Sequence, residues 1–133
     1  RLLKYNNKLK KKYGYKNVEF LYNISREDTI KYIRNSKVYI LSSNHEVAPV
    51  VICEAMASGV PFISTDVWIV KNLPGGIIVK NIKCMSGAMK LLTTDSVQYK
   101  KYSNDGKEFA NNNLRLEACI DRLEKFVIQT VGV

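Results

Sequence analysis

The segment KVYILSSNHEVAPVVICEAMASGVPFIST, residues 37–65, decides the fold class. Its first six residues are rich in β-branched and aromatic side chains and predict a strand over 37–42. After a polar stretch, PVVICEAMAS (49–58) predicts a helix, because proline suits a first helical position that needs no N–H and Gly59 suits the helix end. Residues 61–65 predict the next strand. A strand, a helix and a strand in this order indicate an α/β fold with a parallel sheet.

The flanking sequence continues this alternation of short strands and helices. Val18 to Tyr22 predicts a short buried strand, and Ser25, followed by acids, predicts the N-cap of a helix that reaches about Asn35. A helical turn over 69–73 and a fourth strand over 77–80 follow. Three further helices are then predicted, over 85–93, over 97–111 and along the amphipathic stripe of Leu116, Cys119, Ile120, Leu123 and Val127.

Length and composition are those of one ordinary globular domain. The 133 residues fit a single domain, and 46% apolar and 25% charged residues are normal proportions for a soluble protein. No run reaches the roughly 18 apolar residues of a membrane-spanning helix, and no apolar stretch of a signal peptide follows the basic N-terminus. Cys53, Cys84 and Cys119 form no metal-binding or disulfide pattern. A reduced, cytoplasmic protein is therefore expected.

The positive charge is concentrated at the N-terminus. Residues 1–16 hold seven of the 21 basic residues and no acid, so they account for +7 of the net charge of +9. Leu2, Tyr5, Leu9 and Tyr13 have helical spacing and predict a helix over 2–13 with lysines on its other faces. Such a face is either simply solvated or a contact for an anionic inner-membrane surface or nucleic acid.

The helix over 49–58 and the loop before it carry the candidate chemistry. The first backbone N–H groups of a helix lack internal partners and attract anions; here these are the N–H groups of Val50, Val51 and Ile52. Glu54 is the one charged residue in an otherwise apolar helix, and a buried carboxylate requires a partner, such as a ligand. It lies about 6 Å along the axis from Val50, which suits a ribose whose diphosphate sits at the helix start. Glu46 lies on the outer side of this phosphate site.

These residues resemble a known family. Glu46, seven residues and Glu54 resemble the E-x7-E motif of glycosyltransferase family 4, the group 1 retaining glycosyltransferases. EAMASGVPFISTDV (54–67) is similar to that family's EAMA-x-G-x-PV-I-x-TDVG segment, and residues 18–43 are similar to the stretch that precedes it. The resemblance covers about residues 17–80.

The resemblance implies a GT-B architecture, in which two Rossmann-like domains enclose the active site and the C-terminal one binds a nucleotide-sugar donor. Residues 1–133 are then one partial domain, with a basic helix (1–16), a βα core (17–80) and C-terminal helices (84–133). By resemblance Glu54 holds the ribose, Glu46 is the catalytic residue near the sugar, and Ile24 contacts the base. The backbone of the following residues binds the diphosphate and sugar: Val47, Ala48, Pro49, Val50 and Val51. Transfer of a hexose is expected, with the nucleotide-sugar as substrate and without cofactor or metal.

The sequence also departs from the family pattern. No stretch before Val18 matches the family's basic segment that clamps the diphosphate, and the domain that binds the acceptor, a sugar or a lipid-linked glycan, is expected to lie outside this sequence. The family's strand order is 3-2-1-4-5-6, and the predicted strands correspond to 3, 4, 5 and 6. Trp68 and Tyr22 stand where glycine is usual, and Ser42 replaces a proline. Trp68 narrows the donor pocket or fills a hydrophobic gap. The chain alone is expected to be inactive, and a non-catalytic nucleotide- or partner-binding module is the alternative.

Overall fold

The computed structural model describes residues 2–14 and 17–132. Every predicted helix is present, with ends within a few residues of expectation. In chain order the elements are α1 (Leu2–Tyr13), α2 (Arg26–Arg34), β1 (Tyr39–Leu41), α3 (Val50–Ala57), β2 (Phe62–Thr65), the 3₁₀ helix η1 (Trp68–Asn72), β3 (Gly76–Val79), the 3₁₀ helix η2 (Ile82–Cys84), α4 (Met85–Thr94), α5 (Ser96–Asn113) and α6 (Leu116–Val131).

The three strands form one parallel sheet in the order β1-β2-β3. Tyr39 pairs with Phe62, and Phe62 pairs with Gly76. The predicted α/β class with a parallel sheet is therefore confirmed, and the strand order agrees with the 4-5-6 part of the expected sheet. Because all three strands run the same way, their carboxyl ends meet at one edge, where the loop after β1 also begins.

The central strand β2 is covered on both faces. Phe62 belongs to a core with Ile52 and Met56 of α3 and Ala110 of α5. The next residue, Ile63, belongs to a second core formed by β3 and α4, whose members are Val79, Met85, Ala88 and Leu92. Successive strand residues point to opposite faces, so apolar residues at both positions are what a strand between two helical layers requires.

Two glycines allow β3 to approach its neighbours closely. A Cβ on Gly76 would lie 2.3 Å from the ring of Phe62, so only glycine fits there. Gly75 has a φ of +88°, and a Cβ on it would lie 2.6 Å from the Cα of Gly106 in α5. The turn before β3 is thus packed directly against α5.

The predicted helix ends are largely confirmed. The Ser25 hydroxyl accepts a hydrogen bond from the Asp28 N–H at 3.0 Å and caps α2. Gly59, with a φ of +70°, lies just after the last residues of α3. Pro49 differs by one position from expectation. Its ψ of 99° is extended, so it is the N-cap of α3 and Val50 is the first helical residue.

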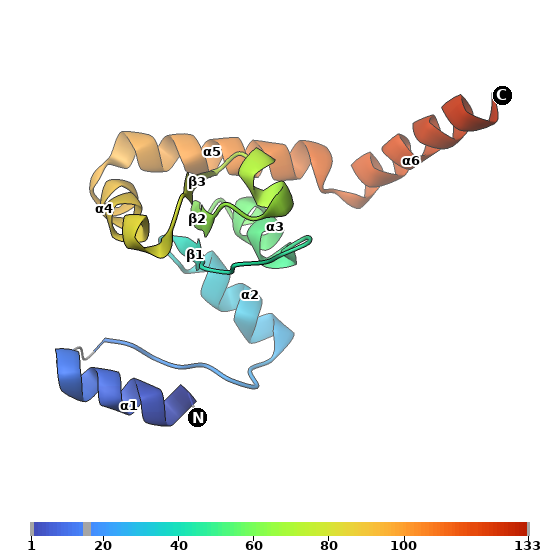
Figure 1. Cartoon of the computed structure of the whole chain (residues 1–133). Coiled ribbons are helices and arrows are strands. Elements are labelled where there is room, and N and C mark those ends of the chain that lie inside the picture. The colour runs from blue at the N-terminus through green and yellow to red at the C-terminus, as the bar shows by residue number, and fades with distance from the viewer. Residues whose placement is uncertain (1, 15–16, 133) are drawn as a thin grey trace.

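The predicted strand over 18–22 is wrong. Within the described residues this segment pairs with no strand, and its apolar side chains are exposed. A strand needs a neighbour for its backbone hydrogen bonds, and the sequence pattern does not reveal whether one is present. Figure 1 shows the segment running between α1 and α2, away from the sheet.

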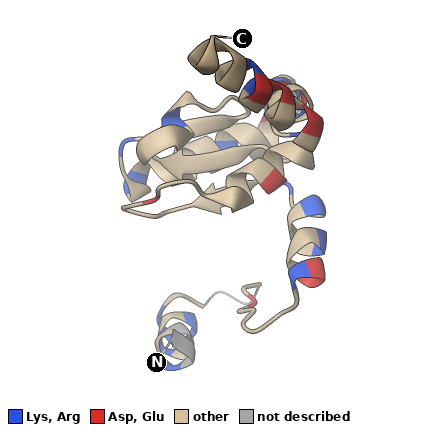
Figure 2. Cartoon of the chain, turned by 90° about the vertical axis from the view of Figure 1, so that its right-hand side faces the viewer, with Lys and Arg blue, Asp and Glu red and all other residues tan. Residues whose placement is uncertain are grey.

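The first and last helices project from the body of the domain (Figure 1). The lysines of α1 are exposed apart from the partly buried Lys10, and Figure 2 shows basic residues gathered on that helix. Arg1 and Lys16 of the predicted basic segment lie outside the described residues. The apolar stripe of α6 is exposed along its length, including Leu123 and Phe126. No helix in the described ranges is long and apolar enough to cross a membrane.

Candidate functional site

Two adjoining hollows open beyond the carboxyl ends of the three strands. The first has a volume of about 570 Å³ and the second about 590 Å³. The first hollow is lined by Asn44, His45, Glu46, Val47, Asp66, Val67 and Trp68. The second hollow is lined by Ser43, Asn44, Thr65, Asp66, Val67, Lys80, Asn81, Ile82 and Lys83. This is the edge at which parallel α/β sheets bind ligands.

The loop between β1 and α3 is held by two side-chain hydrogen bonds. The Ser43 hydroxyl donates to Glu46 Oε1 at 2.7 Å, and the Thr65 hydroxyl at the end of β2 donates to the Ser43 carbonyl. Glu46 is half-buried and lines the first hollow. The predicted catalytic residue therefore lies in a hollow, with one carboxylate oxygen occupied by Ser43.

The start of α3 offers two backbone donors rather than the expected three. The Ile52 N–H donates to the Pro49 carbonyl at 3.0 Å, so the prediction that it is free is wrong; the helix begins with a tight 3₁₀-type turn. Within the described residues, the N–H groups of Val50 and Val51 have no backbone acceptor. Val47, Ala48 and Val50 are exposed, and Pro49 is buried.

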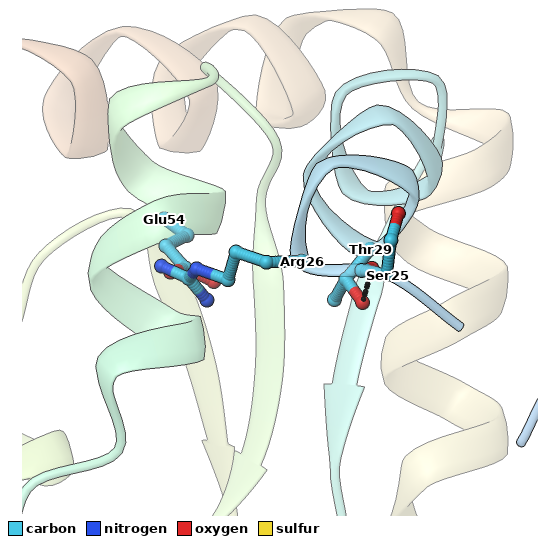
Figure 3. A network of polar contacts seen from close by, with 4 residues as sticks. All are labelled: Ser25, Arg26, Thr29 and Glu54. Carbon is cyan, nitrogen blue, oxygen red and sulfur yellow. Dashed lines mark hydrogen bonds and ion pairs between the residues drawn. The ribbon is translucent and has the colours of Figure 1, made fainter. Parts of the chain in front are cut away.

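Glu54 is in the middle of α3, and it has a protein partner that the sequence did not reveal. Its Oε1 forms an ion pair with the Arg26 guanidinium, which reaches across from α2 (Figure 3). The Glu54 side chain is only 14% exposed, whereas that of Arg26 is 64% exposed. Among the described residues, Glu54 Oε2 is buried and has no hydrogen-bond partner. Half of this carboxylate is therefore satisfied, and half is not.

The two motif glutamates act on the same tyrosine. Burial raises the pKa of Tyr39 in β1, and the negative charges of Glu54 and, less strongly, Glu46 raise it further. A raised pKa keeps the Tyr39 phenol neutral at physiological pH. Glu46 and Glu54 are thus both near enough to Tyr39 for their charges to affect its pKa, although only Glu46 lines the first hollow.

Ile24 and Arg26 are at the N-terminal end of α2. Ile24, the predicted base contact, is partly exposed and lies two residues before Arg26. A signal for Arg26 was present in the sequence: it is in the first turn after the N-cap Ser25, where a cation is disfavoured by the helix dipole. A basic residue in that position gains from an acidic partner on a neighbouring helix.

Trp68 and Asp66 are part of the site. Trp68 is 73% exposed, so the interpretation that it fills a hydrophobic gap is wrong; it forms a wall of the first hollow. Asp66, just after β2, lines both hollows, and the loop residue His45 lines the first.

A third, apolar hollow of about 280 Å³ adjoins the start of α3. Val50 and Cys53 of α3, Leu73, Phe109 and Arg122 are among its lining residues. Burial raises the pKa of the Cys53 thiol, and the charge of the adjacent Glu54 adds to this. No group of three or more metal-ligating side chains occurs among the described residues.

The fold and site define an α/β domain that presents a helix start and two acidic side chains beyond the carboxyl ends of a parallel sheet. Residues 3–109 match the family model described as "Glycosyl transferases group 1", and the chain belongs to this family. It is a glycosyltransferase domain whose Rossmann-like fold corresponds to part of the GT-B architecture. No match is found among curated proteins.

A solved structure supports the fold assignment. Sucrose-phosphate synthase from Thermosynechococcus elongatus matches with a TM-score of 0.78 at 20% sequence identity, over 97% of this chain. The chain spans 34% of the length of that protein. The similarity is therefore one of fold, and it is consistent with the expected identity of this chain as the C-terminal part of a GT-B enzyme.

Proposed function

We propose that this domain binds a nucleoside-diphosphate sugar for retaining transfer of a hexose, with the diphosphate at the start of α3. The observation that carries the proposal is Glu54 Oε2, a buried acceptor without a protein partner, one helical turn from that start. A buried unpaired carboxylate oxygen is costly, and a ligand hydroxyl is the simplest group to satisfy it.

The diphosphate is assigned to the N–H groups of Val50 and Val51. Both donors are unoccupied by backbone acceptors in the described structure, and they lie at the positive end of the α3 dipole. The loop residues Val47 and Ala48, just before α3, are exposed. Arg26 adds a largely exposed cation, which pairs with Glu54 one turn into α3.

The ribose is assigned to Glu54. Arg26 pairs with Oε1 and its side chain is mostly exposed, so displacement of that side chain would open the buried Oε2 to a ribose hydroxyl. The base then lies toward Ile24, at the start of the helix that supplies Arg26. The donor is thereby recognised at three points without a metal ion.

Glu46 is assigned to the transferred sugar. It lines the first hollow and accepts from Ser43, which leaves its other oxygen available to a sugar hydroxyl. Catalysis in this arrangement comes from positioning and from stabilisation of the leaving diphosphate by the helix start. The acceptor, a sugar or lipid-linked glycan, would be bound by a second domain that is not part of this sequence.

Calorimetric titration with UDP, GDP and ADP tests the proposal. We expect one of them to bind, and Glu54→Ala to weaken it at least about tenfold, since the loss of a charged hydrogen bond is worth about 1.5–3 kcal/mol. Glu108→Ala, an exposed acid on α5, is the matched control and should change nothing. Equal binding to the wild type and to Glu54→Ala contradicts the assignment. Measured transfer of sugar by the chain alone would exclude the non-catalytic alternative.

Membrane or nucleic-acid contact through residues 1–16 stays a prediction. The exposed lysines of α1 are compatible with it. The family match begins at residue 3, however, and so treats α1 as part of the transferase domain. Retention on anionic vesicles, lost when Lys8, Lys10, Lys11 and Lys12 are neutralised, tests this contact separately.

A further inference from the structure

Trp68 is the only tryptophan of the chain, and the structure exposes it. Its indole is 73% exposed and belongs to no core cluster, although tryptophan is among the residues that gain most from burial. It lines the first hollow together with Asp66 and the loop residues Asn44 to Val47. An exposed aromatic side chain in a hollow is a feature of binding sites rather than of packing.

The backbone at Trp68 supports a functional role. Its φ of +28° is a conformation that bulky residues rarely adopt. Val67 and Val70, on either side in sequence, are fully packed in the core and hold the segment in place. The surrounding fold therefore maintains an unfavourable backbone geometry whose effect is to hold the indole outside the core. Such strain is typically found at functional sites.

The groups around the indole define the class of ligand. Asn44, Glu46 and Asp66 line the same hollow and can hydrogen-bond to hydroxyl groups, and His45 adds an imidazole. A pyranose ring has the complementary chemistry: an apolar face of C–H groups that packs on an aromatic ring, and a rim of hydroxyls that donate to carboxylates and amides.

We propose that Trp68 is a stacking platform for a pyranose ring in the first hollow, with Glu46 and Asp66 receiving its hydroxyls. The identification of that ring as the donor's or the acceptor's sugar rests on the proposed function. The stacking itself requires only a sugar. The carboxylates limit the site to neutral or cationic sugars, because an anionic sugar would be repelled.

Because Trp68 is the sole tryptophan, intrinsic tryptophan fluorescence reports on it alone. The probes are the pairs UDP and UDP-glucose, and GDP and GDP-mannose, together with maltose and cellobiose. We expect at least one sugar-bearing probe to shift the emission and to protect it from a soluble quencher, beyond any effect of the matching diphosphate. A response to a nucleotide-sugar assigns the donor sugar, and a response to a free disaccharide assigns the acceptor.

Calorimetry on variants tests whether the indole itself carries the binding. Trp68→Phe should retain sugar binding, and Trp68→Ala should weaken it about tenfold, because aromatic stacking is worth on the order of that factor. Phe126→Ala, which removes an exposed aromatic from α6, is the control and should have no effect. Diphosphate binding should be unchanged in Trp68→Ala, since its assigned contacts are on α3.

The two proposals fail in different ways. Loss of all nucleotide binding, with a fluorescence response to disaccharides, overturns the donor site and leaves the platform standing. Normal diphosphate binding with no response to any sugar-bearing probe overturns the platform. An emission shift that depends only on protein concentration also overturns it, because Trp68 would then be a contact between proteins. If Trp68→Ala does not fold, as judged by circular dichroism, two other results test the platform: sugar binding by Trp68→Phe, and protection of the wild-type tryptophan from the quencher by sugar.

Discussion

Arg26 in α2 and Glu54 in α3 form an ion pair between residues 28 positions apart in sequence. The pair joins α2 to α3 and involves Glu54, the one acidic residue of α3. Removing one partner leaves the other unsatisfied, so the pair can be measured only by a double-mutant cycle. We expect a coupling energy of about 1 kcal/mol from urea unfolding of Arg26→Met, Glu54→Gln and the double variant, since the arginine is largely solvated. Additive effects of the two substitutions would show that the pair contributes nothing to stability.

The strain at Trp68 makes a prediction about stability. At a φ of +28°, glycine should be favoured over alanine, because only the residue with a Cβ is strained there. We expect Trp68→Gly to be about 1 kcal/mol more stable than Trp68→Ala in thermal or urea unfolding. The matched comparison is Val97→Gly against Val97→Ala, at an exposed position in the first turn of α5, where alanine should be the more stable.

The glycines that bring β3 against its neighbours should resist substitution. Gly76→Ala forces a Cβ into the Phe62 ring and should destabilise by about 1–3 kcal/mol or prevent folding. Gly87→Ala in α4 is the control: a Cβ there meets nothing within 4 Å, and helix propensity predicts stabilisation by about 0.5–1 kcal/mol. Urea unfolding of the two variants should therefore give changes of opposite sign.

The three cysteines should differ in reactivity. Burial and the nearby Glu54 raise the pKa of the Cys53 thiol. At a given pH, a smaller fraction of Cys53 is therefore the reactive thiolate than of an ordinary cysteine. Cys84 and Cys119 are exposed. We expect iodoacetamide at mildly alkaline pH to modify Cys53 last, as followed by mass spectrometry of peptides, and the delay to shrink as the pH is raised. Equal rates in the folded protein would mean that α3 opens readily.

The exposed apolar residues of α6 and of the segment over 18–22 predict association in isolation. Mass action then raises the unfolding temperature with protein concentration. We expect a low midpoint that increases with concentration in thermal unfolding. Replacing Leu123 and Phe126 with lysine should reduce the dependence. A high midpoint independent of concentration would contradict this expectation.

Local signals in the sequence predicted most of the fold. Ser25 marked the start of α2, Gly59 the end of α3, and the β-branched runs the three strands of the sheet. These features depend on a few neighbouring residues, which a sequence displays directly. The strand predicted over 18–22 failed because a strand also depends on a neighbour, and no local pattern encodes that neighbour.

The sequence predicted only those parts of the candidate site that depend on residues close together in the chain. The spacing of Glu46 and Glu54 is local, and the structure couples both to Tyr39. Arg26 lies 28 residues from its partner, so only the packing of α2 on α3 reveals the pair. Trp68 was noticed as an unusual residue, but its exposure depends on how Val67 and Val70 are buried on either side. Side-chain direction at such a position comes from tertiary packing.

Val67 is part of the central core and also lines both hollows. Most other residues around the two hollows project from loops that follow the strands and take no part in the cores. Substitutions at those loop residues can therefore change which ligand binds without disturbing the core. Val67 is the exception, because a substituted side chain there must pack in the core and also fit the bound ligand.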